Sequence, residues 1–222
     1  MMFMHETVEF AEVETVEIDG QRFYQVEGNH MPSITTVLSI LSEKSIAKWK
    51  ARVGEEKANY ISRTAATHGT VVHQMMEDYI NNLKPKYDNN LQQAAFLKLR
   101  KVCDERIGKV YAQEVPLYSV GLRIAGRVDC VAEFDGKISI IDFKTSAKPK
   151  RREYIYNYFM QETAYAKMWE ERTGTAIEQI VTIVAPENSP TAQVFVESTE
   201  DWIDQLKETI DRWWNEKSVI NE

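Results

Sequence analysis

The sequence predicts a mixed α/β or α+β fold, in which a central mixed β-sheet is flanked by helices. Two observations support this class. Apolar residues recur at helical intervals ahead of residue 112, and the pattern then changes to that of strands over residues 112–143. Helical and strand-like segments alternate after that. The chain has 222 residues, 43% of them hydrophobic, so it can bury one good-sized core, and one domain is the simplest reading.

The individual elements follow from periodicity and from turn or cap residues. Asp19-Gly20 is typical of a tight hairpin turn, and the hydroxyl of Ser33 suits an N-cap at the start of a helical region. The predicted strands span residues 15–18, 22–26, 112–118, 124–134, 137–143, 177–185 and 191–197. The predicted helices span residues 45–66 (with a break near Gly54), 70–82 (after Gly69), 91–111, 153–171 and 201–215.

A tight turn is expected to place two acids opposite each other. Asp135-Gly136 separates strands 124–134 and 137–143 and is the pair most typical of a type I′ hairpin. If the turn closes there, Asp129 faces Asp142, with the Cβ atoms about 4.5–5.5 Å apart on one face. Facing carboxylates repel each other, and one of them gives up its charge unless a cation lies between them.

Lys144 is expected on the same face as Asp142, because side chains alternate along a strand. Two acids and a lysine on one face are the parts of a Mg²⁺ site that activates water against a phosphate. Taken singly, these residues have plainer explanations: both acids can lie at a solvent-exposed edge of the sheet, or Lys144 can simply form an ion pair with Asp142. The facing of Asp129 and Asp142, combined with Lys144, favours the metal site.

Other polar residues fit a supporting role at such a site. His73 and Glu77 share a helix face, and a neutral histidine is a suitable metal ligand. Glu114, on the strand before the hairpin, can supply a further oxygen or orient a ligand. Gln161 and Tyr165 are four residues apart on a later helix and can hold a phosphate or orient Lys144. Each of these residues also fits an ordinary structural or surface role.

Basic residues gather in two segments, although the net charge of −7 argues mildly against a general nucleic-acid coat protein. One segment is helix 45–66, where basic and aromatic residues mix, as they do along single-strand paths. The other directly follows the acidic pair. A solvated loop and an amphipathic surface are the plain alternatives. The candidate strand-binding residues are Lys48, Trp49, Arg52, Thr145, Lys148, Lys150, Arg151 and Arg152.

Composition excludes several classes of protein. Cys103 and Cys130 are the only cysteines, which suggests neither a disulfide framework nor a four-cysteine metal site. A reducing cytoplasm is the expected location. No apolar run approaches the length of about 18 residues needed to span a membrane, and the N-terminus lacks a secretory pattern.

These segments, in this order, resemble the RecB-like branch of the PD-(D/E)XK nuclease superfamily. The resemblance covers residues 32–185 and is carried by Gly69-Thr70 with His73 and Glu77, Glu114, Gly126 to Asp129, Asp142 to Thr145, and Gln161 with Tyr165. The helical opening from Pro32 to Leu38, followed by Trp49-Lys50, is similar to that of the mitochondrial genome maintenance exonucleases and related phage exonucleases.

The resemblance implies a restriction-endonuclease-like core that binds Mg²⁺ or Mn²⁺. The implied metal ligands are His73, Asp129, Asp142 and the backbone carbonyl of Phe143. Lys144 would orient the attacking water, and Gln161 and Tyr165 would support the site and the DNA. Many relatives also hold an iron–sulfur cluster with four cysteines. Two cysteines are too few, so no iron–sulfur cluster is expected here.

The sequence therefore predicts a metal-dependent DNA exonuclease that acts on single-stranded ends in replication, repair or recombination. The expected parts of the single nuclease domain are an N-terminal hairpin (1–30), an arch-like helical segment (32–67), a catalytic core (68–197) and a C-terminal helix (198–222). Two alternatives stay open: a structure-specific endonuclease or flap nuclease, and a catalytically silent nucleic-acid-binding module. A helicase, a single-strand-binding protein or a recombination protein would act as a partner in trans. A phage origin would place the protein in the host cytoplasm.

Overall fold

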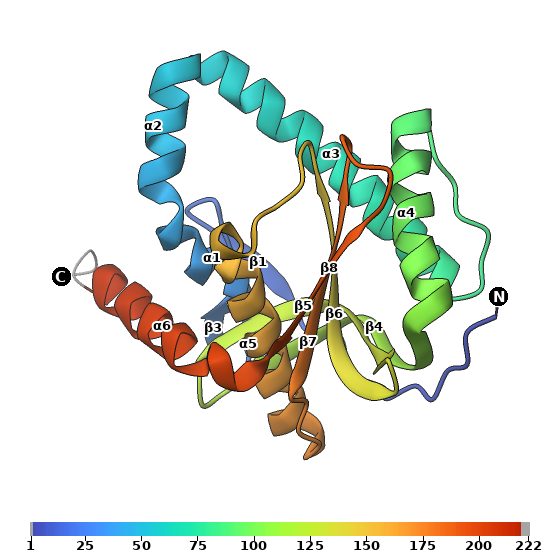
Figure 1. Cartoon of the computed structure of the whole chain (residues 1–222). Helices are drawn as coiled ribbons and strands as arrows, with labels where there is room; N and C mark the ends of the chain where they lie inside the picture. Colours follow the sequence, from blue (N-terminus) through green and yellow to red (C-terminus); the bar gives the residue numbers. More distant parts are fainter. Residues whose placement is uncertain (1, 219–222) are drawn as a thin grey trace.

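The computed structural model describes residues 2–218, which form a five-stranded and a three-stranded β-sheet. The larger sheet has the order β4-β5-β6-β7-β8. It is mixed, because β6 and β7 are parallel and the other neighbours are antiparallel. Its strands are β4 (Ile107–Ser119), β5 (Ile124–Phe134), β6 (Lys137–Ser146), β7 (Gln179–Pro186) and β8 (Gln193–Ser198). The predicted mixed sheet with flanking helices is confirmed (Figure 1).

Helices cover both faces of this sheet, and successive strand residues serve opposite faces. Ile140 and Ile180 pack into a core shared with α1, α5 and α6, whereas Ile141 and Val181 pack into a core shared with α3 and α4. The strands can therefore be apolar throughout, as expected of a sheet that is buried on two sides. The helices are α1 (Ile34–Leu38), α2 (Glu43–Val53), α3 (Glu55–Ile80), α4 (Asn90–Arg106), α5 (Tyr156–Thr173) and α6 (Ile203–Ser218).

The turn between β5 and β6 is the type I′ turn that the sequence predicts. Asp135 and Gly136 have φ angles of 52° and 80°, and a left-handed conformation at both central residues defines this turn. The pairs then run from Phe134–Lys137 to Cys130–Ile141 in the predicted register.

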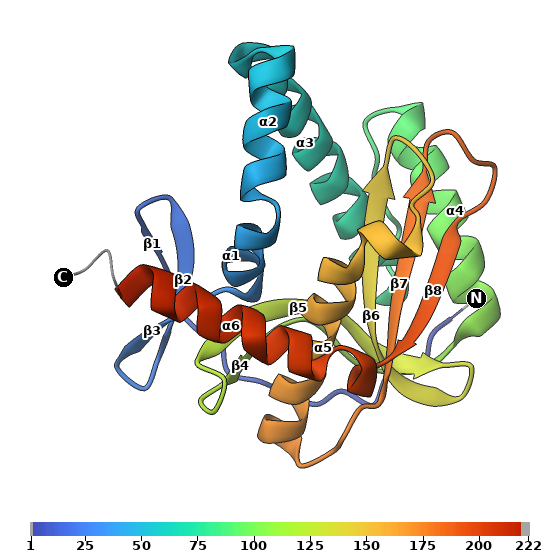
Figure 2. The same cartoon turned by 60° about the vertical axis from the view of Figure 1, so that its left-hand side comes forward.

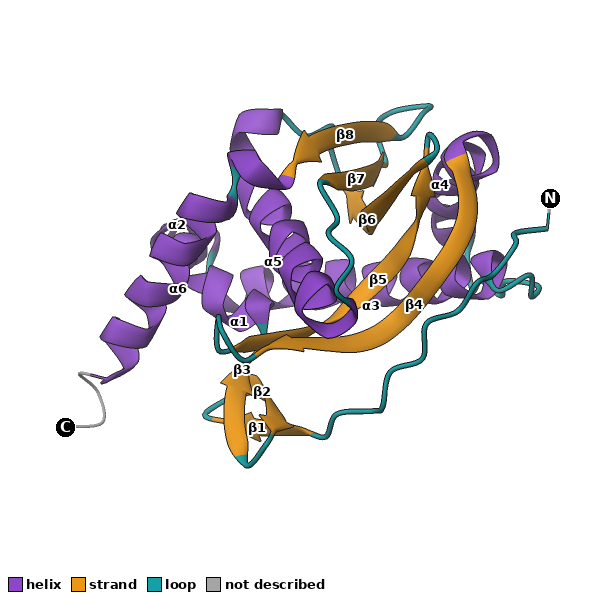
Figure 3. Ribbon diagram, turned by 90° about the horizontal axis from the view of Figure 1, so that it is seen from below, coloured by secondary structure: helices purple, strands orange, loops and turns teal. Residues whose placement is uncertain are grey.

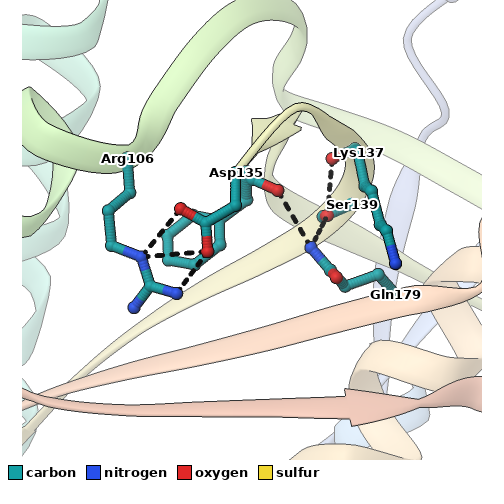
Figure 4. Close-up of polar contacts among 6 residues, drawn as sticks. Arg106, Asp135, Lys137, Ser139 and Gln179 are labelled. Atoms are coloured by element: carbon teal, nitrogen blue, oxygen red, sulfur yellow. Dashed lines mark hydrogen bonds and ion pairs between the residues drawn. The ribbon is translucent and has the colours of Figure 1, made fainter.

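Side chains from neighbouring elements hold this turn in place (Figure 4). Arg106, at the end of α4, forms an ion pair with Asp135 and lies 4.2 Å above the ring of Phe134. Gln179, at the start of β7, donates hydrogen bonds to the carbonyl of Phe134 (3.0 Å) and to Oγ of Ser139 (2.9 Å). These contacts stabilise the register on which the positions of Asp129 and Asp142 depend.

The N-terminal hairpin gains a third strand that the sequence reading missed. The small sheet consists of β1 (Thr15–Ile18), β2 (Gln21–Val26) and β3 (Asn29–Pro32). Its residues Tyr24, Val26 and Met31 pack against Ala125 at the start of β5. Figure 3 shows the small sheet beside one end of the long strands β4 and β5.

Two predicted helix boundaries are wrong. The sequence predicts separate helices over 45–66 and 70–82, but α3 runs without interruption from Glu55 to Ile80 through Gly69. A glycine inside a helix costs only about 1 kcal/mol, and the buried side chains of Val72, Met75 and Met76 on the following turns offset that cost. The predicted break near Gly54 is confirmed, because α2 ends there.

The second wrong boundary is the end of helix 91–111. α4 stops at Arg106, and residues from Ile107 onward form β4. Ile107 and Val110 pair with Phe134 and Ala132 of β5. Sheet pairing therefore overrides a helical pattern that continues in the local sequence. The predicted C-terminal helix is present to residue 218, and residues 219–222 lie outside the described part.

The helices α2 and α3 form a hairpin that projects beyond the larger sheet (Figures 1 and 2). No residue of α2 is buried, in keeping with a segment that packs on little besides its neighbour. Within residues 2–218, no helix combines the length and the apolar character needed to cross a bilayer.

Candidate active site

The two predicted acids lie where strands β5 and β6 separate. Their ladder ends at the pair Cys130–Ile141, and Asp129 and Asp142 are the next residue on each strand. The backbone N–H of Phe143 donates to Oδ2 of Asp129 at 3.0 Å, so a side chain of β5 bonds to the backbone of β6 at this position. Asp129 is thereby held at the fork between the strands.

A histidine and two acids meet at this fork. His73 on α3, Glu114 on β4 and Asp129 on β5 each offer a ligand atom, and these three atoms lie within 4.8 Å of one another. Nδ1 of His73 is 3.3 Å from Oδ2 of Asp129. The sequence analysis expected Glu114 to supply a further oxygen or to orient a ligand, and the structure places it within ligand range, in a group that does not include Asp142.

An unusual backbone conformation accompanies the position of Glu114. Its pairs on either side, Gln113–Cys130 and Val115–Val128, put Glu114 level with Asp129 across the sheet. Glu114 nevertheless has a φ of 48°, which is uncommon for a residue other than glycine. Such strain costs on the order of 1–3 kcal/mol and clusters at functional sites. The guanidinium of Arg127 donates a hydrogen bond to the Glu114 carbonyl and supports this backbone.

Asp142 is paired inside the protein and does not point freely toward the other acids. Its Oδ2 lies 2.5 Å from Nζ of Lys144, and its Oδ1 accepts a hydrogen bond from Nε2 of Gln161 at 3.2 Å. Only 2% of the Asp142 side chain is exposed, against 20% for Lys144. The ring of Tyr158 lies 5.2 Å from the same ammonium group. The plain ion pair considered for Lys144 is therefore present, within the site.

Crowding and burial raise the pKa values of two of the acids. Burial raises the pKa of Asp142 to about 6; Lys144 opposes this shift and Asp129 adds to it. Burial, followed by repulsion from Asp129 and Glu77, raises the pKa of Glu114 to about 8. Carboxyl groups with raised pKa values in a cleft are typical of functional sites, and a bound cation would relieve their repulsion.

His73, Glu114, Asp129 and Lys144 line one cleft of about 540 Å³, and Asp142 lies behind Lys144 without lining it. Its walls come from α3, β4, β5, β6, α5 and the small N-terminal sheet. The predicted residues that line it are His73, Glu77, Glu114, Asp129, Lys144, Thr145, Gln161 and Tyr165. The sequence reading missed Arg22, Tyr24, Gln74 and Arg127, which also line the cleft. Arg127 stands beside Asp129 in the recognised motif, but no sequence signal links the distant Arg22 and Tyr24 to the site.

The donor set fits a hard divalent cation. Carboxylate oxygens are the ligands that Mg²⁺ prefers, and Mn²⁺ also accepts imidazole nitrogen. His73, Glu114 and Asp129 would hold the ion, and Asp142 would join them if its carboxylate turned from Lys144. A divalent cation bound there would supply Lewis-acid activation of a phosphate and of water.

Gly126 makes room for the phenol of Tyr165. A Cβ atom at residue 126 would lie 2.7 Å from Cε1 and 3.0 Å from the hydroxyl of Tyr165, whose side chain is buried. We expect Gly126→Ala to push this ring into the cleft and to destabilise the protein by about 1–3 kcal/mol through overpacking. Urea unfolding measures the loss of stability. The double variant Gly126→Ala/Tyr165→Phe shows whether the Tyr165 hydroxyl contributes to the clash. Unchanged stability of Gly126→Ala would contradict the contact.

Some of the candidate strand-binding residues are exposed, and others are engaged in contacts within the protein. Lys48 and Arg52 are exposed on α2, where Trp49 is half-buried, and Lys148 is exposed in the loop after β6. Arg152 instead forms two hydrogen bonds of 2.5 Å with Glu197 and lies above Trp202. Of the remaining three, Arg151 pairs with Glu153, the backbone of Lys150 bonds to Gln193, and Thr145 lines the cleft. Tertiary contacts thus engage Arg152, and the structure brings none of Lys148 to Arg152 into the cleft lining.

The chain also matches known proteins. The model of the PD-(D/E)XK nuclease superfamily matches residues 95–218. Mitochondrial genome maintenance exonuclease 1 of Homo sapiens is 26% identical over 190 residues, covering 78% of this chain and 54% of that protein. The Xenopus tropicalis protein of the same name is 32% identical over 155 residues, covering 62% of this chain and 44% of that protein. The chain spans about half the length of the curated relatives it matches.

Among solved structures, a putative exonuclease from Eubacterium rectale superimposes with a TM-score of 0.47 at 10% identity, covering 68% of this chain and 66% of that chain. The family model, by contrast, covers more than half of the sequence and includes Glu114, Asp129, Asp142 and Lys144. The protein therefore belongs to the PD-(D/E)XK nuclease superfamily.

Proposed function

We propose that this nuclease is a metal-dependent DNA exonuclease that hydrolyses single-stranded DNA from free ends, with Mg²⁺ or Mn²⁺ as its cofactor. Its expected setting is DNA replication, repair or recombination. The observation that carries the proposal is the meeting of His73, Glu114 and Asp129 in one cleft with Lys144, which pairs with the buried Asp142. The names of the curated relatives agree with exonuclease activity.

The residues of the site have distinct tasks in this proposal. Glu114, Asp129 and Asp142 offer carboxylate oxygens to a cation, and His73 offers an imidazole nitrogen. Lys144 is a compact cation that can contact the scissile phosphate and the attacking water together. Gln161 holds Asp142 in place through its hydrogen bond and so supports the position of Lys144. Placing fixed charges where negative charge develops is the main source of catalysis in such sites.

The helical hairpin formed by residues 43–66 supports the preference for a single strand with a free end. It carries six basic and three acidic residues, whereas the whole chain has a net charge of −7. It projects beyond the sheet (Figure 2). From it, α3 continues to His73, which lines the cleft. A basic hairpin that leads into the site can guide a strand by its phosphates, and a strand that passes under it must enter by an end.

Linear and circular single-stranded DNA of matched sequence test this proposal. With Mg²⁺ we expect the linear strand to be degraded and the circle to persist, because the circle offers no end. The same reaction with a chelator that removes the metal serves as the control. Equal cleavage of both strands would favour the endonuclease alternative. Tight binding without hydrolysis in either Mg²⁺ or Mn²⁺ would favour the silent binding module. Labels at either end of the linear strand report the polarity.

A further inference from the structure

One wall of the catalytic cleft comes from the small N-terminal sheet. Arg22 and Tyr24 lie on β2 and line the cleft together with Asp129 and Lys144. They are two residues apart on one strand, so their side chains project from the same face. The superfamily match begins at residue 95, and this wall therefore lies outside the segment that carries the match.

Arg22 differs from the other lysine and arginine side chains of the cleft in having no partner. Lys144 pairs with Asp142 at 2.5 Å, and Arg127 pairs with Glu12 at 2.7 Å. Within residues 2–218, the exposed guanidinium of Arg22 forms no hydrogen bond or ion pair. Its charge is thus available to a ligand in the cleft.

The backbone that carries Arg22 is firmly held. Its carbonyl accepts a hydrogen bond from the N–H of Ser33 at 3.0 Å. Tyr24 is only 2% exposed and packs with Met31 and Ala125. Glu17 lies opposite Arg22 in the β1–β2 register yet does not pair with it. The arginine therefore has a fixed base and a free end, as a ligand-binding side chain requires.

We propose that Arg22 binds a phosphate group of the substrate strand next to the scissile phosphate, so that the N-terminal sheet positions the strand in the cleft. This proposal rests on the nuclease function above. A guanidinium matches phosphate oxygens with two parallel hydrogen bonds. The cleft is of a size that holds small ligands, and its acids repel phosphates, so an unpaired cation at its wall compensates. The phosphate is either a terminal monoester or an internal diester of the strand.

Binding to the full chain carrying Asp129→Asn tests this site without catalysis. The probes are short single strands of one sequence that carry either a phosphate or a hydroxyl at the 5′ end and either a phosphate or a hydroxyl at the 3′ end. Fluorescence anisotropy measures their binding. We expect Arg22→Gln to raise the dissociation constant roughly tenfold, as the loss of one charge-assisted hydrogen bond does, and to reduce the salt-dependence slope by about one. Arg22→Lys keeps the charge, so its dissociation constant should lie between those of the protein with Arg22 and of Arg22→Gln.

The matched control is Arg212→Gln, because Arg212 is exposed on α6, pairs with Glu216 and lies outside the cleft. An effect confined to strands with one phosphorylated end assigns Arg22 to a terminal monoester, and an equal effect on all strands assigns it to an internal diester. Wild-type affinity in Arg22→Gln, or an equal loss in the Arg212 control, would overturn the proposal. Failure of hydrolysis by the wild-type chain, with Arg22-dependent binding intact, would instead reject the nuclease function alone.

Discussion

Replacing Lys144 with alanine is expected to abolish hydrolysis and to destabilise the protein at the same time. Activity should fall by about 10²–10³-fold or more, since removing one positioned group that stabilises the transition state costs about 10²–10³-fold. The Asp142 side chain, 2% exposed in the intact protein, would lose its cation. Breaking a buried ion pair from one side costs about 3 kcal/mol, because a buried charge is left unpaired. Single-turnover hydrolysis and urea unfolding measure the two effects separately.

A double replacement separates the ion pair from catalysis. Asp142→Asn/Lys144→Met removes both charges, so we expect it to be more stable than Lys144→Ala although it is equally inactive. The control is Lys167→Ala, which breaks a partly exposed pair with Glu170 and should leave activity and stability nearly unchanged. If Lys144→Ala kept full activity, the proposed site would be wrong. If it unfolded at the wild-type urea concentration, the pair would carry no stability.

Asp129→Asn is expected to remove metal binding while the protein without metal keeps its stability. Asp129 belongs to the cluster with His73 and Glu114 and also accepts the N–H of Phe143. Its charge adds to the repulsion that raises the pKa of Glu114 to about 8 and that of Asp142 to about 6. Removing that charge relieves the repulsion, whereas the amide oxygen of asparagine can still accept the backbone hydrogen bond. Activity should fall by more than about 10³-fold.

The metal dependence of stability provides the measurement. A cation at a hundred times its dissociation constant stabilises the folded state by about 2.7 kcal/mol. We expect Mn²⁺ to raise the melting temperature of the wild-type protein and to leave Asp129→Asn unchanged. Asp211→Asn, at an exposed position of α6, is the matched control and should respond as the wild type does. An equal shift in Asp129→Asn would place the cation elsewhere.

Local chemistry made the central part of the site predictable. Asp135-Gly136 demands left-handed conformations at both positions, and the type I′ turn then sets the pairing of β5 with β6. Because side chains alternate along a strand, the register alone put Asp129 level with Asp142 and Lys144 on the same face as Asp142. The order of these motifs along the sequence was sufficient to identify the superfamily.

Other features depended on contacts between segments far apart in the sequence. The helical pattern of residues 91–111 continues past the end of α4 into β4. Residues 107–111 form a strand instead of a helix because they pair with β5, which the local pattern does not reveal. The sequence analysis named Arg152 as a candidate strand-binding residue, yet it forms an ion pair with Glu197 in the folded chain.

What the sequence determined by itself is therefore the set of acids, the lysine and the hairpin that aligns them, because turn conformation and strand alternation are local properties. Only the tertiary structure brought Glu114 within range of His73 and Asp129, bonded Gln161 to Asp142, and placed Arg22 in the wall of the cleft. These arrangements arise from burial and packing between separate elements, and no local pattern of residues encodes them.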